Sequence, residues 1–391
     1  MAWDNQIQLR IETDRFGPFT FQLGVDMPCL ESLLMRVDDA HKRFKTSPLS
    51  QVASRLEKEV VVSSIYGTNS IEGGTLSVEE TEQALDLTPV QVKDIEQRRA
   101  INLKNAYELA QRAAAHPGWR FDIEFIKQIH TAVTDQLPHE YNRPGLLRDN
   151  PKGITTRVGS QEHGGIYKPP QYGKDVERLL NGLIEWHQQL VKHGVPVLVR
   201  APLVHLYYEL IHPFWDGNGR VGRVLEATLL QAEGYKYAPF AQARYYLEYI
   251  HAYFTLFNTT RKKAEKNSEV PNTDFVAFFL EGMLASINAL HDRVNALIAQ
   301  ILFENEVKRL HNEKAINARQ YAIVSQIMAT GKPVSLPDLT KAPWYQALYV
   351  KLTDKTRQRD LKGLRELGIV RQDDTNSLWV GYVNTAKASD E

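Results

Sequence analysis

The chain has 391 residues, of which 43% are hydrophobic and 24% are charged. These values are typical of a folded globular chain and exclude one dominated by disorder or a fibrous repeat. Lys and Arg number 47, as do Asp and Glu, so no global charge attracts nucleic acid or an anionic membrane. The single cysteine, Cys29, excludes an intrachain disulfide and a thiolate zinc cluster and favours the cytoplasm. No signal peptide or membrane span is expected.

The first third of the chain is predicted to be helical after a short hairpin. Residues 1–25 alternate in hydrophobicity around Gly17 and Pro18, which indicates two short strands. Beyond them, apolar side chains recur at helical spacing, and Ser77 with Glu80 forms a capping-box pattern. Helices are therefore expected over 30–44, 49–66, from 77 onward, 90–114 and 122–136.

The middle of the chain contains a break in this helical pattern. Residues 138–172 carry too many prolines and glycines for a continuous helix. Two β-prone pieces, 154–158 and 165–168, flank this stretch's GSQEHG sequence and predict an exposed hairpin. Helices are then expected over 173–193, 200–211, 219–233 and 243–262, and one long apolar helix from 273 to about 311.

The C-terminal segment has the element order of a winged helix. Helices over 317–329, about 344–352 and 354–367 precede two strands around Asp373. The helix 354–367 carries five of the 11 basic side chains between residues 315 and 391. A winged-helix-like domain over 313–391 is therefore expected, with DNA as a candidate partner of its basic helix.

The stretch His212-Pro-Phe-Trp-Asp-Gly-Asn-Gly-Arg-Val-Gly-Arg223 has the composition of a polyphosphate site. It places a tight loop at the N-terminus of an expected helix, where free backbone N–H groups and the helix dipole bind phosphate. Gly217 and Gly219 allow the backbone to approach an anion. Arg220 and Arg223 lie three positions apart, where their guanidinium groups can hold two further phosphates.

The same stretch contains a candidate metal ligand and a candidate base. Asp216 offers one hard oxygen, which fits Mg²⁺ bound mainly through phosphates and water. His212 ends a helix, and its pKa class suits removal of a proton from a hydroxyl near neutral pH. Each feature alone is common in turns and caps, but their joint occurrence within 12 residues indicates a site. A dinucleotide-binding fingerprint is disfavoured, because the residues before the glycines are predicted to be helical.

The stretch resembles the signature of the Fic (filamentation induced by cAMP) family, HPFxDGNGRxxR, at every specified position. The resemblance implies a mainly α Fic-type core with a β-hairpin flap. It also implies that His212 activates a Ser, Thr or Tyr hydroxyl of a target protein, which attacks the α-phosphate of ATP. By the same resemblance Asp216 holds Mg²⁺. Gly217, Asn218 and Gly219 bind the α-phosphate, and Arg220 and Arg223 take the β- and γ-phosphates.

The resemblance extends upstream of this stretch. The hairpin at 154–170 corresponds to the flap that binds the target, and RPGLLR at 143–148 is similar to the turn before it. Thr68-Asn-Ser-Ile-Glu72-Gly73 resembles the inhibitory motif (S/T)xxxE(G/N). That motif implies that the Glu72 carboxylate pairs with Arg223 and takes the place of the γ-phosphate.

The adenine pocket is less well defined by the sequence. Relatives often have an Asn-Arg pair in the tyrosine-rich helix after the motif, whereas this chain has Tyr249 and Ile250 there. Tyr245, Tyr246 and Tyr249 are therefore either adenine-stacking residues or core aromatics.

Three regions are expected: an N-terminal helical region over 1–115 with the inhibitory motif at 68–73, a Fic core with its following long helix over 116–312, and the winged-helix-like domain over 313–391. The expected function is AMP transfer from ATP to a protein hydroxyl, including one of the chain itself, with Mg²⁺ and with autoinhibition by Glu72. The alternatives are AMP removal or phosphate transfer on the same fold, a DNA-binding regulator, and a toxin–antitoxin-like scaffold. A homodimer is a further option.

Overall fold

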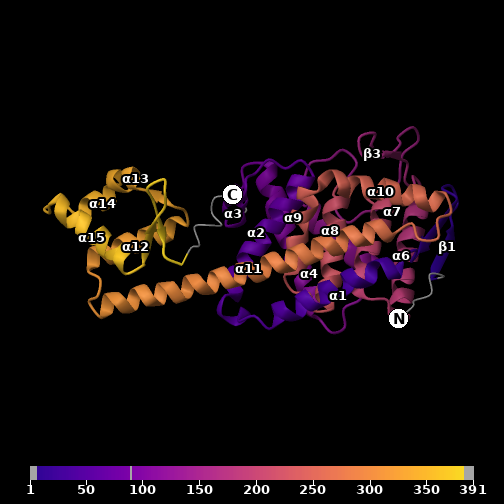
Figure 1. Cartoon of the computed structure of the whole chain (residues 1–391). Helices are drawn as coiled ribbons and strands as arrows, with labels where there is room; N and C mark the ends of the chain where they lie inside the picture. Colours follow the sequence, from indigo (N-terminus) through magenta and orange to yellow (C-terminus); the bar gives the residue numbers. More distant parts are fainter. Residues whose placement is uncertain (1–6, 89, 383–391) are drawn as a thin grey trace. The chain divides into compact units, whose positions relative to one another are not determined.

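The computed structural model describes residues 7–88 and 90–382 (Figure 1). Contacts divide the chain into two compact units, 1–292 and 293–391. This division differs from the three expected regions. The expected boundary after residue 115 is absent, because helices from the first 115 residues pack onto later helices of the same unit. The observed boundary after residue 292 falls inside the long helix α11 (Thr273–Asn312), whereas the expected boundary after residue 312 lies at the end of that helix.

Unit 1 begins with the predicted hairpin, formed by β1 (Gln8–Glu12) and β2 (Pro18–Gln22). The strands are antiparallel, with Leu9 opposite Phe21. Phe21 is buried and stacks on Trp186 of α6 (Gly173–Lys192). The hairpin thus contributes apolar side chains to the core of unit 1.

The helices of the first third also form as predicted, with shifted ends. The Ser77 and Glu80 capping box opens α3 as expected, while the helix predicted from residue 90 starts at Ile95, after its N-cap Asp94. The bounds are α1 (Met27–Lys45), the short 3₁₀ helix η1 (Leu49–Gln51), α2 (Ala53–Ile71), α3 (Val78–Leu85), α4 (Ile95–Ala115) and α5 (Ile123–Thr134).

The flap hairpin is formed by β3 (Val158–Ser160) and β4 (Gly165–Tyr167). Its first strand starts at the end of the predicted stretch 154–158. Residues 154–157 form no strand because side chains bind their backbone: Asn150 donates to the backbone oxygen of Ile154, and Gln171 accepts the N–H of Thr156. These backbone groups are therefore engaged by side chains instead of by a strand.

Two buried helices, α7 (Val197–Ile211) and α8 (Asn218–Ala232), lie at the centre of unit 1. They pack on each other, and α4 and α9 (Ala238–Glu248) cover α8. The helix predicted over 243–262 is two helices, α9 and α10 (Ile250–Glu265), because Tyr249 between them leaves helical geometry at φ −107° and ψ 39°.

The long helix α11 forms as predicted and is apolar enough, by length and composition, to cross a membrane. It is the one such helix among the described residues, and 56% of the apolar window is buried inside the protein. Phe275, Phe279, Met283 and Ile287 are each at most 2% exposed. Packing in unit 1 therefore accounts for much of this apolar character.

Unit 2 has its own core and a three-stranded sheet of order β5-β7-β6. The helix predicted over about 344–352 forms as the shorter helix Pro343–Leu348, whereas the helix Leu336–Lys341 and the strand Val334–Ser335 were not predicted. The bounds are α12 (Ala318–Thr330), β5 (Val334–Ser335), α13 (Leu336–Lys341), α14 (Pro343–Leu348), α15 (Asp354–Glu366), β6 (Val370–Gln372) and β7 (Ser377–Val380). The winged-helix assignment stays a prediction.

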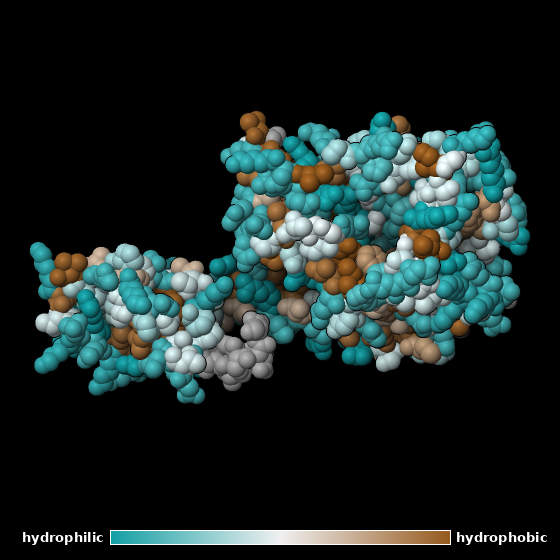
Figure 2. Space-filling view, turned by 90° about the horizontal axis from the view of Figure 1, so that it is seen from above, coloured by the Kyte–Doolittle hydropathy of each residue, from teal (hydrophilic) through white to brown (hydrophobic). Residues whose placement is uncertain are grey.

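On the face drawn in Figure 2, hydrophilic residues cover most of the surface and hydrophobic residues form separate patches. Large apolar side chains exposed on the protein include Met35, Leu146 and Ile166. Ile166 belongs to β4 of the flap hairpin, so one of these exposed apolar side chains lies beside the candidate site.

Candidate functional site

The loop between α7 and α8 has the backbone geometry of an anion-binding helix start. His212 ends α7 in a left-handed conformation, at φ 50° and ψ 63°. Gly217 precedes α8 at φ 81°, and a Cβ there would lie 2.9 Å from Thr134 Cγ2. Only glycine satisfies both constraints. The first N–H groups of α8 therefore start directly after a tight turn, as the sequence predicts.

Asn218 holds this loop in shape through its side chain. Its Oδ1 accepts the N–H of Phe214 at 3.0 Å, and its Nδ2 donates to the Phe214 oxygen at 2.8 Å. The amide side chain is thus engaged within the loop, so the group that Asn218 can offer an anion is its backbone N–H.

His130 on α5 supports the loop and was missed by the sequence analysis. Its ring stacks on Phe214 with centroids 3.6 Å apart. Nδ1 accepts the N–H of Gly145 at 2.9 Å, so Nε2 carries the proton and donates to the Asp216 backbone oxygen at 3.1 Å. Burial lowers the pKa of His130 to about 4, which keeps it neutral in this arrangement. No sequence spacing links this histidine to the motif.

Arg148 fixes the end of α7 and was also missed as a site residue. It is the last residue of the RPGLLR turn. Its Nε donates to the His212 oxygen at 2.6 Å and its Nη2 to the Ile211 oxygen at 3.3 Å. A buried guanidinium on the last carbonyls of a helix completes their hydrogen bonding. Burial lowers the pKa of Arg148 to about 10.

The side chain of His212 lines a cavity of about 330 Å³. Glu209, one helical turn earlier, places Oε2 3.5 Å from His212 Nδ1. Within the described part of the chain, Glu209 Oε1 and His212 Nδ1 are buried without a hydrogen-bond partner. The cavity lining joins the motif to the flap: Glu72, Val158, Gly159, His163, Tyr167, Glu209, Leu210, His212, Gly219, Arg223, Tyr253, Phe254, Phe257 and Asn258.

Asp216 and Arg220 form an ion pair beside this loop. Arg220 Nη2 donates to both Asp216 oxygens, at 3.0 and 3.1 Å. Burial alone raises the pKa of Asp216, but the positive charge of Arg220 and hydrogen bonds outweigh it, so the pKa is lowered. Arg220 Nε and Nη1 are buried with no partner among the described residues. A charged carboxylate beside unused guanidinium donors fits a metal-bound phosphate.

Arg223 and Glu72 meet as the inhibitory motif implies. Glu72 ends α2, and its Oε1 accepts from Arg223 Nη2 at 2.5 Å. Arg223 is 4% exposed, whereas the Glu72 side chain is 34% exposed. A Cβ on Gly219 would collide with Glu72 Oε1. The Glu72 carboxylate therefore lies against the first turn of α8 as well as on Arg223.

A buried polar chain orients Arg223 from behind. Tyr253 OH accepts from Arg223 Nη1 at 3.2 Å and lies 3.1 Å from His205 Nε2. His205 Nδ1 lies 2.8 Å from Glu226, which also accepts from Tyr246 OH. Burial raises the pKa of Tyr253 and of Tyr246, so both hydroxyls stay protonated and can donate.

This arrangement decides between the two roles considered for the tyrosines. Tyr246 is 2% exposed and bonded to Glu226, which makes it a core residue. The rings of Tyr245 and Tyr249 lie with centroids 4.6 Å apart at an interplanar angle of 41°, and neither residue lines the cavity. The Phe and Tyr residues that line the cavity are Tyr167, Tyr253, Phe254 and Phe257.

Together, the fold and the site define a mainly helical protein with an anion-binding loop between two buried helices and a hairpin that lines the same cavity. The Fic/DOC family matches residues 120–230, the stretch that contains the flap and this loop. Residues 120–230 of the chain are thus similar to the Fic/DOC family domain.

Relatives with assigned names agree with this placement. The chain is 30% identical over 194 residues to Protein adenylyltransferase Fic of Aedes aegypti, covering 48% of this chain and 36% of the relative. It is 25% identical over 206 residues to Protein adenylyltransferase fic-1 of Caenorhabditis elegans, covering 52% and 38%. The matched stretch thus spans less than half of the length of either relative.

Solved structures show the same fold. The crystal structure of a Fic family protein from Desulfovibrio desulfuricans G20 has a TM-score of 0.55 at 19% identity, covering 91% of this chain and 97% of that chain. Fic-1 from C. elegans has a TM-score of 0.52 at 22% identity, covering 69% and 75%. The mainly helical fold expected from the sequence is confirmed.

Proposed function

We propose that the chain is a protein adenylyltransferase that transfers AMP from ATP to a Ser, Thr or Tyr hydroxyl of a target protein. The observation that carries the proposal is that one cavity contains His212, Arg223 and the first turn of α8. A candidate base, a buried cation and an anion-binding helix start are the groups that nucleotidyl transfer needs. The names of the two curated relatives support the same activity.

In this proposal the N–H groups of residues 217–219 bind the α-phosphate. Arg220 and Arg223 bind the β- and γ-phosphates, Arg220 through the donors that have no protein partner among the described residues. His212 accepts the hydroxyl proton, the hydroxyl oxygen bonds to the α-phosphorus, and the bond to pyrophosphate breaks. Asp216 would hold Mg²⁺, which neutralises phosphate charge when bound.

Glu209 is proposed as a positioning residue for His212. Its carboxylate lies 3.5 Å from His212 Nδ1, and a small rotation brings the two groups into hydrogen-bond distance. An Nδ1–H held by a carboxylate leaves Nε2 as the basic nitrogen. This nitrogen is the one that would take the hydroxyl proton.

The flap hairpin is proposed as the surface that receives the target. Val158, Gly159 and Tyr167 of its strands line the cavity, while Ile166 is 50% exposed. The hairpin has two strands, so a target segment can add to a free edge by main-chain hydrogen bonds. Such pairing would hold a hydroxyl side chain near His212.

Autoinhibition by Glu72 is proposed from its contact with Arg223. The carboxylate holds the guanidinium expected to bind the γ-phosphate and lies against the first turn of α8. Two negative groups cannot share this position at low cost. ATP must therefore displace Glu72 or bind in a pose that misaligns the α-phosphate.

One experiment distinguishes AMP transfer from phosphate transfer and from AMP removal, the two alternative reactions on the same fold. The protein is incubated with lysate, Mg²⁺ and ATP labelled at either the α- or the γ-phosphate. Label from the α-phosphate on protein supports AMP transfer. Label from the γ-phosphate only would instead show phosphate transfer. Release of AMP from an AMP-modified target, without any AMP addition, would show removal.

Asp216→Ala is expected to shift the Mg²⁺ dependence of activity to higher Mg²⁺ concentrations. The variant removes the carboxylate proposed to hold the ion, so more Mg²⁺ is needed for half-maximal transfer and the maximal rate falls. Transfer is measured as a function of Mg²⁺ concentration. Asp135→Ala, which removes an exposed carboxylate outside the cavity lining, is the matched control. An unchanged Mg²⁺ dependence in Asp216→Ala would exclude the metal role.

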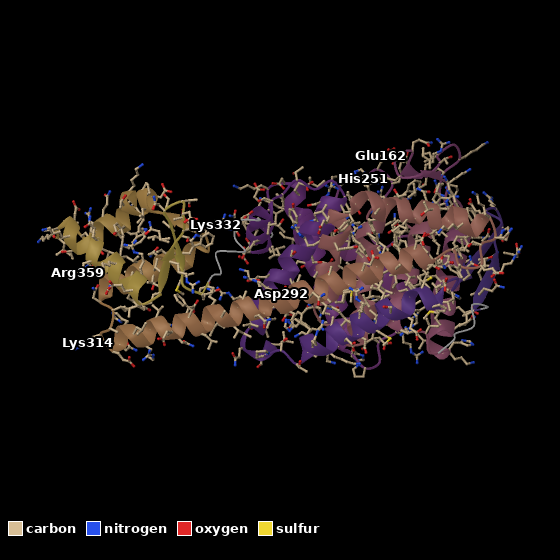
Figure 3. The ribbon with its side chains drawn as sticks, in the orientation of Figure 1. Glu162, His251, Asp292, Lys314, Lys332 and Arg359 are labelled. Carbon is tan, nitrogen blue, oxygen red and sulfur yellow. The ribbon has the colours of Figure 1, made fainter. Side chains whose placement is uncertain are left out.

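DNA binding by unit 2 is a second candidate function. On α15 the exposed side chains of Lys355, Arg359 and Lys362 follow helical spacing. Arg359, which is labelled in Figure 3, makes no ion pair with another residue of the described ranges. In contrast, Arg357 pairs with Asp354 at 3.2 Å and lies over the Tyr349 ring.

Arg359→Ala is therefore expected to lower DNA affinity and to reduce the salt dependence of binding by about one phosphate contact. Arg357→Ala is the internal comparison and is expected to have a smaller effect, because its guanidinium is already engaged. Binding of the full chain to a duplex is measured between about 50 and 200 mM salt. Absence of salt-sensitive binding at low salt would contradict this second function.

A further inference from the structure

Three side chains of residue types that commonly bind metals lie close together where the flap contacts α10. Figure 3 labels two of them, Glu162 and His251. Glu162 and His163 lie in the loop between β3 and β4, and His251 lies in the first turn of α10. Their ligand atoms all lie within 4.8 Å of one another. None of the three residues is used by the proposed transfer reaction.

The distances within this cluster match a metal site. His163 Nε2 lies 3.2 Å from His251 Nδ1, which in turn lies 3.5 Å from Glu162 Oε1. Ligands at about 2.0–2.1 Å in a tetrahedral site are separated by roughly 3.3–3.4 Å. One ion can therefore contact these atoms after only small side-chain movements.

The surrounding residues prepare His163 to act as a ligand. Ser160 Oγ lies 2.9 Å from His163 Nδ1, and an Nδ1–H donated to this oxygen leaves the lone pair on Nε2, which faces His251. Asn258 Nδ2 donates to the backbone oxygens of His163 and Gly165, at 3.0 and 2.9 Å. These two hydrogen bonds hold the loop close to α10 without the ion.

We propose that Glu162, His163 and His251 form a binding site for a first-row transition metal ion of the Zn²⁺ class. Two imidazoles and one carboxylate suit such borderline ions, whereas Mg²⁺ and Ca²⁺ prefer oxygen ligands throughout. The side chains of Glu162 and His251 are 69% and 74% exposed, so the ion has access and water can complete its coordination.

Binding of the ion would link the flap hairpin to α10 and reduce the motion of the hairpin. The ion joins two flap residues to His251 of α10, and His163 also lines the cavity next to Val158 and Gly159. A bound ion therefore restrains the hairpin that borders the candidate site. The inference concerns this cluster alone and does not depend on the proposed AMP transfer.

The test is a titration of the tag-free full chain with Zn²⁺ by calorimetry and with Co²⁺ by visible absorption. The wild-type protein is expected to bind one ion at this site and to give the absorption of a Co²⁺ site with nitrogen and oxygen ligands. His251→Ala and Glu162→Gln are expected to lose this binding. Ser160→Ala is expected to weaken it about 10-fold, because it removes the partner that orients His163. His193→Ala removes an exposed histidine elsewhere and is the matched control.

A second measurement follows the flap itself. Zn²⁺ is expected to slow backbone hydrogen exchange over residues 158–167 in the wild type and in His193→Ala, but not in His251→Ala. Equal Zn²⁺ affinity of the wild type and His251→Ala would overturn the proposal. A wild-type protein that binds no Zn²⁺ at a concentration of about 100 μM would also overturn the proposal.

Discussion

Replacement of Glu72 by alanine raises AMP transfer, including self-modification, if the proposed autoinhibition is correct. The variant removes the carboxylate that holds Arg223 Nη2 at 2.5 Å and lies against Gly219. Because the Glu72 side chain is 34% exposed, the contact is worth about 1–1.5 kcal/mol, which corresponds to roughly a 5- to 10-fold change. We therefore expect transfer of label from α-labelled ATP to increase by a factor in this range.

The same substitution is expected to lower stability slightly. The Glu72 side chain is 34% exposed, so the lost ion pair contributes about 1 kcal/mol, which shifts Tm by about 2–4 °C. Arg223 retains its contacts with Thr68 and Tyr253. A gain in activity with a small loss in stability is the signature of a restraint on the site.

Glu57→Ala is the matched control, because it removes another carboxylate of α2, one that lies 4.0 Å from Lys236 and outside the cavity. It is expected to leave activity unchanged. If Glu72→Ala folds and is no more active than the wild type, Glu72 is an ordinary helix-capping residue. The proposed transfer activity would still stand in that case.

Replacement of His212 has the largest expected effect in the opposite direction. Removal of a general base lowers the rate by about 10²- to 10⁴-fold. ATP binding is expected to persist, because the proposed phosphate contacts come from residues 217–219, Arg220 and Arg223. The measurements are AMP transfer and, separately, ATP affinity by calorimetry in the Glu72→Ala background.

The choice of substitution matters because His212 has a left-handed backbone, at φ 50°. Alanine is strained there, whereas asparagine adopts this conformation more readily. Comparison of His212→Asn with His212→Ala therefore separates the loss of the base from a change in the loop. We expect both variants to lose transfer equally. Glu72→Ala combined with His212→Asn is expected to lose the gain. Full activity of His212→Asn would exclude its role as the base.

Local signals were sufficient to predict much of this fold. The helical spacing of apolar residues, the Ser77 capping pattern and the Gly17 turn led to elements that the structure confirms. The errors fall where a local pattern competes with tertiary contacts. Asn150 and Gln171 take up the backbone of the expected strand at 154–157, and Tyr249 divides a helix that periodicity alone predicts as continuous.

The candidate site divides in the same way. The loop from His212 to Arg223 was predicted because all its members are neighbours in the chain, and glycine spacing and a helix start are local properties. His130 and Arg148 were not predicted as site residues, because each reaches the loop from another element, through contacts with Phe214, Asp216 and the last carbonyls of α7. No spacing in the sequence encodes such contacts.

The sequence by itself determined the mainly helical architecture and the chemistry of the motif, because these depend on periodicity, capping and residue type. The tertiary structure shows the contact between the Glu72 carboxylate and Arg223 that the inhibitory motif implies, and it alone decided that Tyr246 belongs to the core. It also decided that Glu162 and His163 meet His251 across the flap. The physical reason is that hydrogen bonds and ion pairs act over a few ångströms, and residues distant in sequence reach this range only when the helices pack.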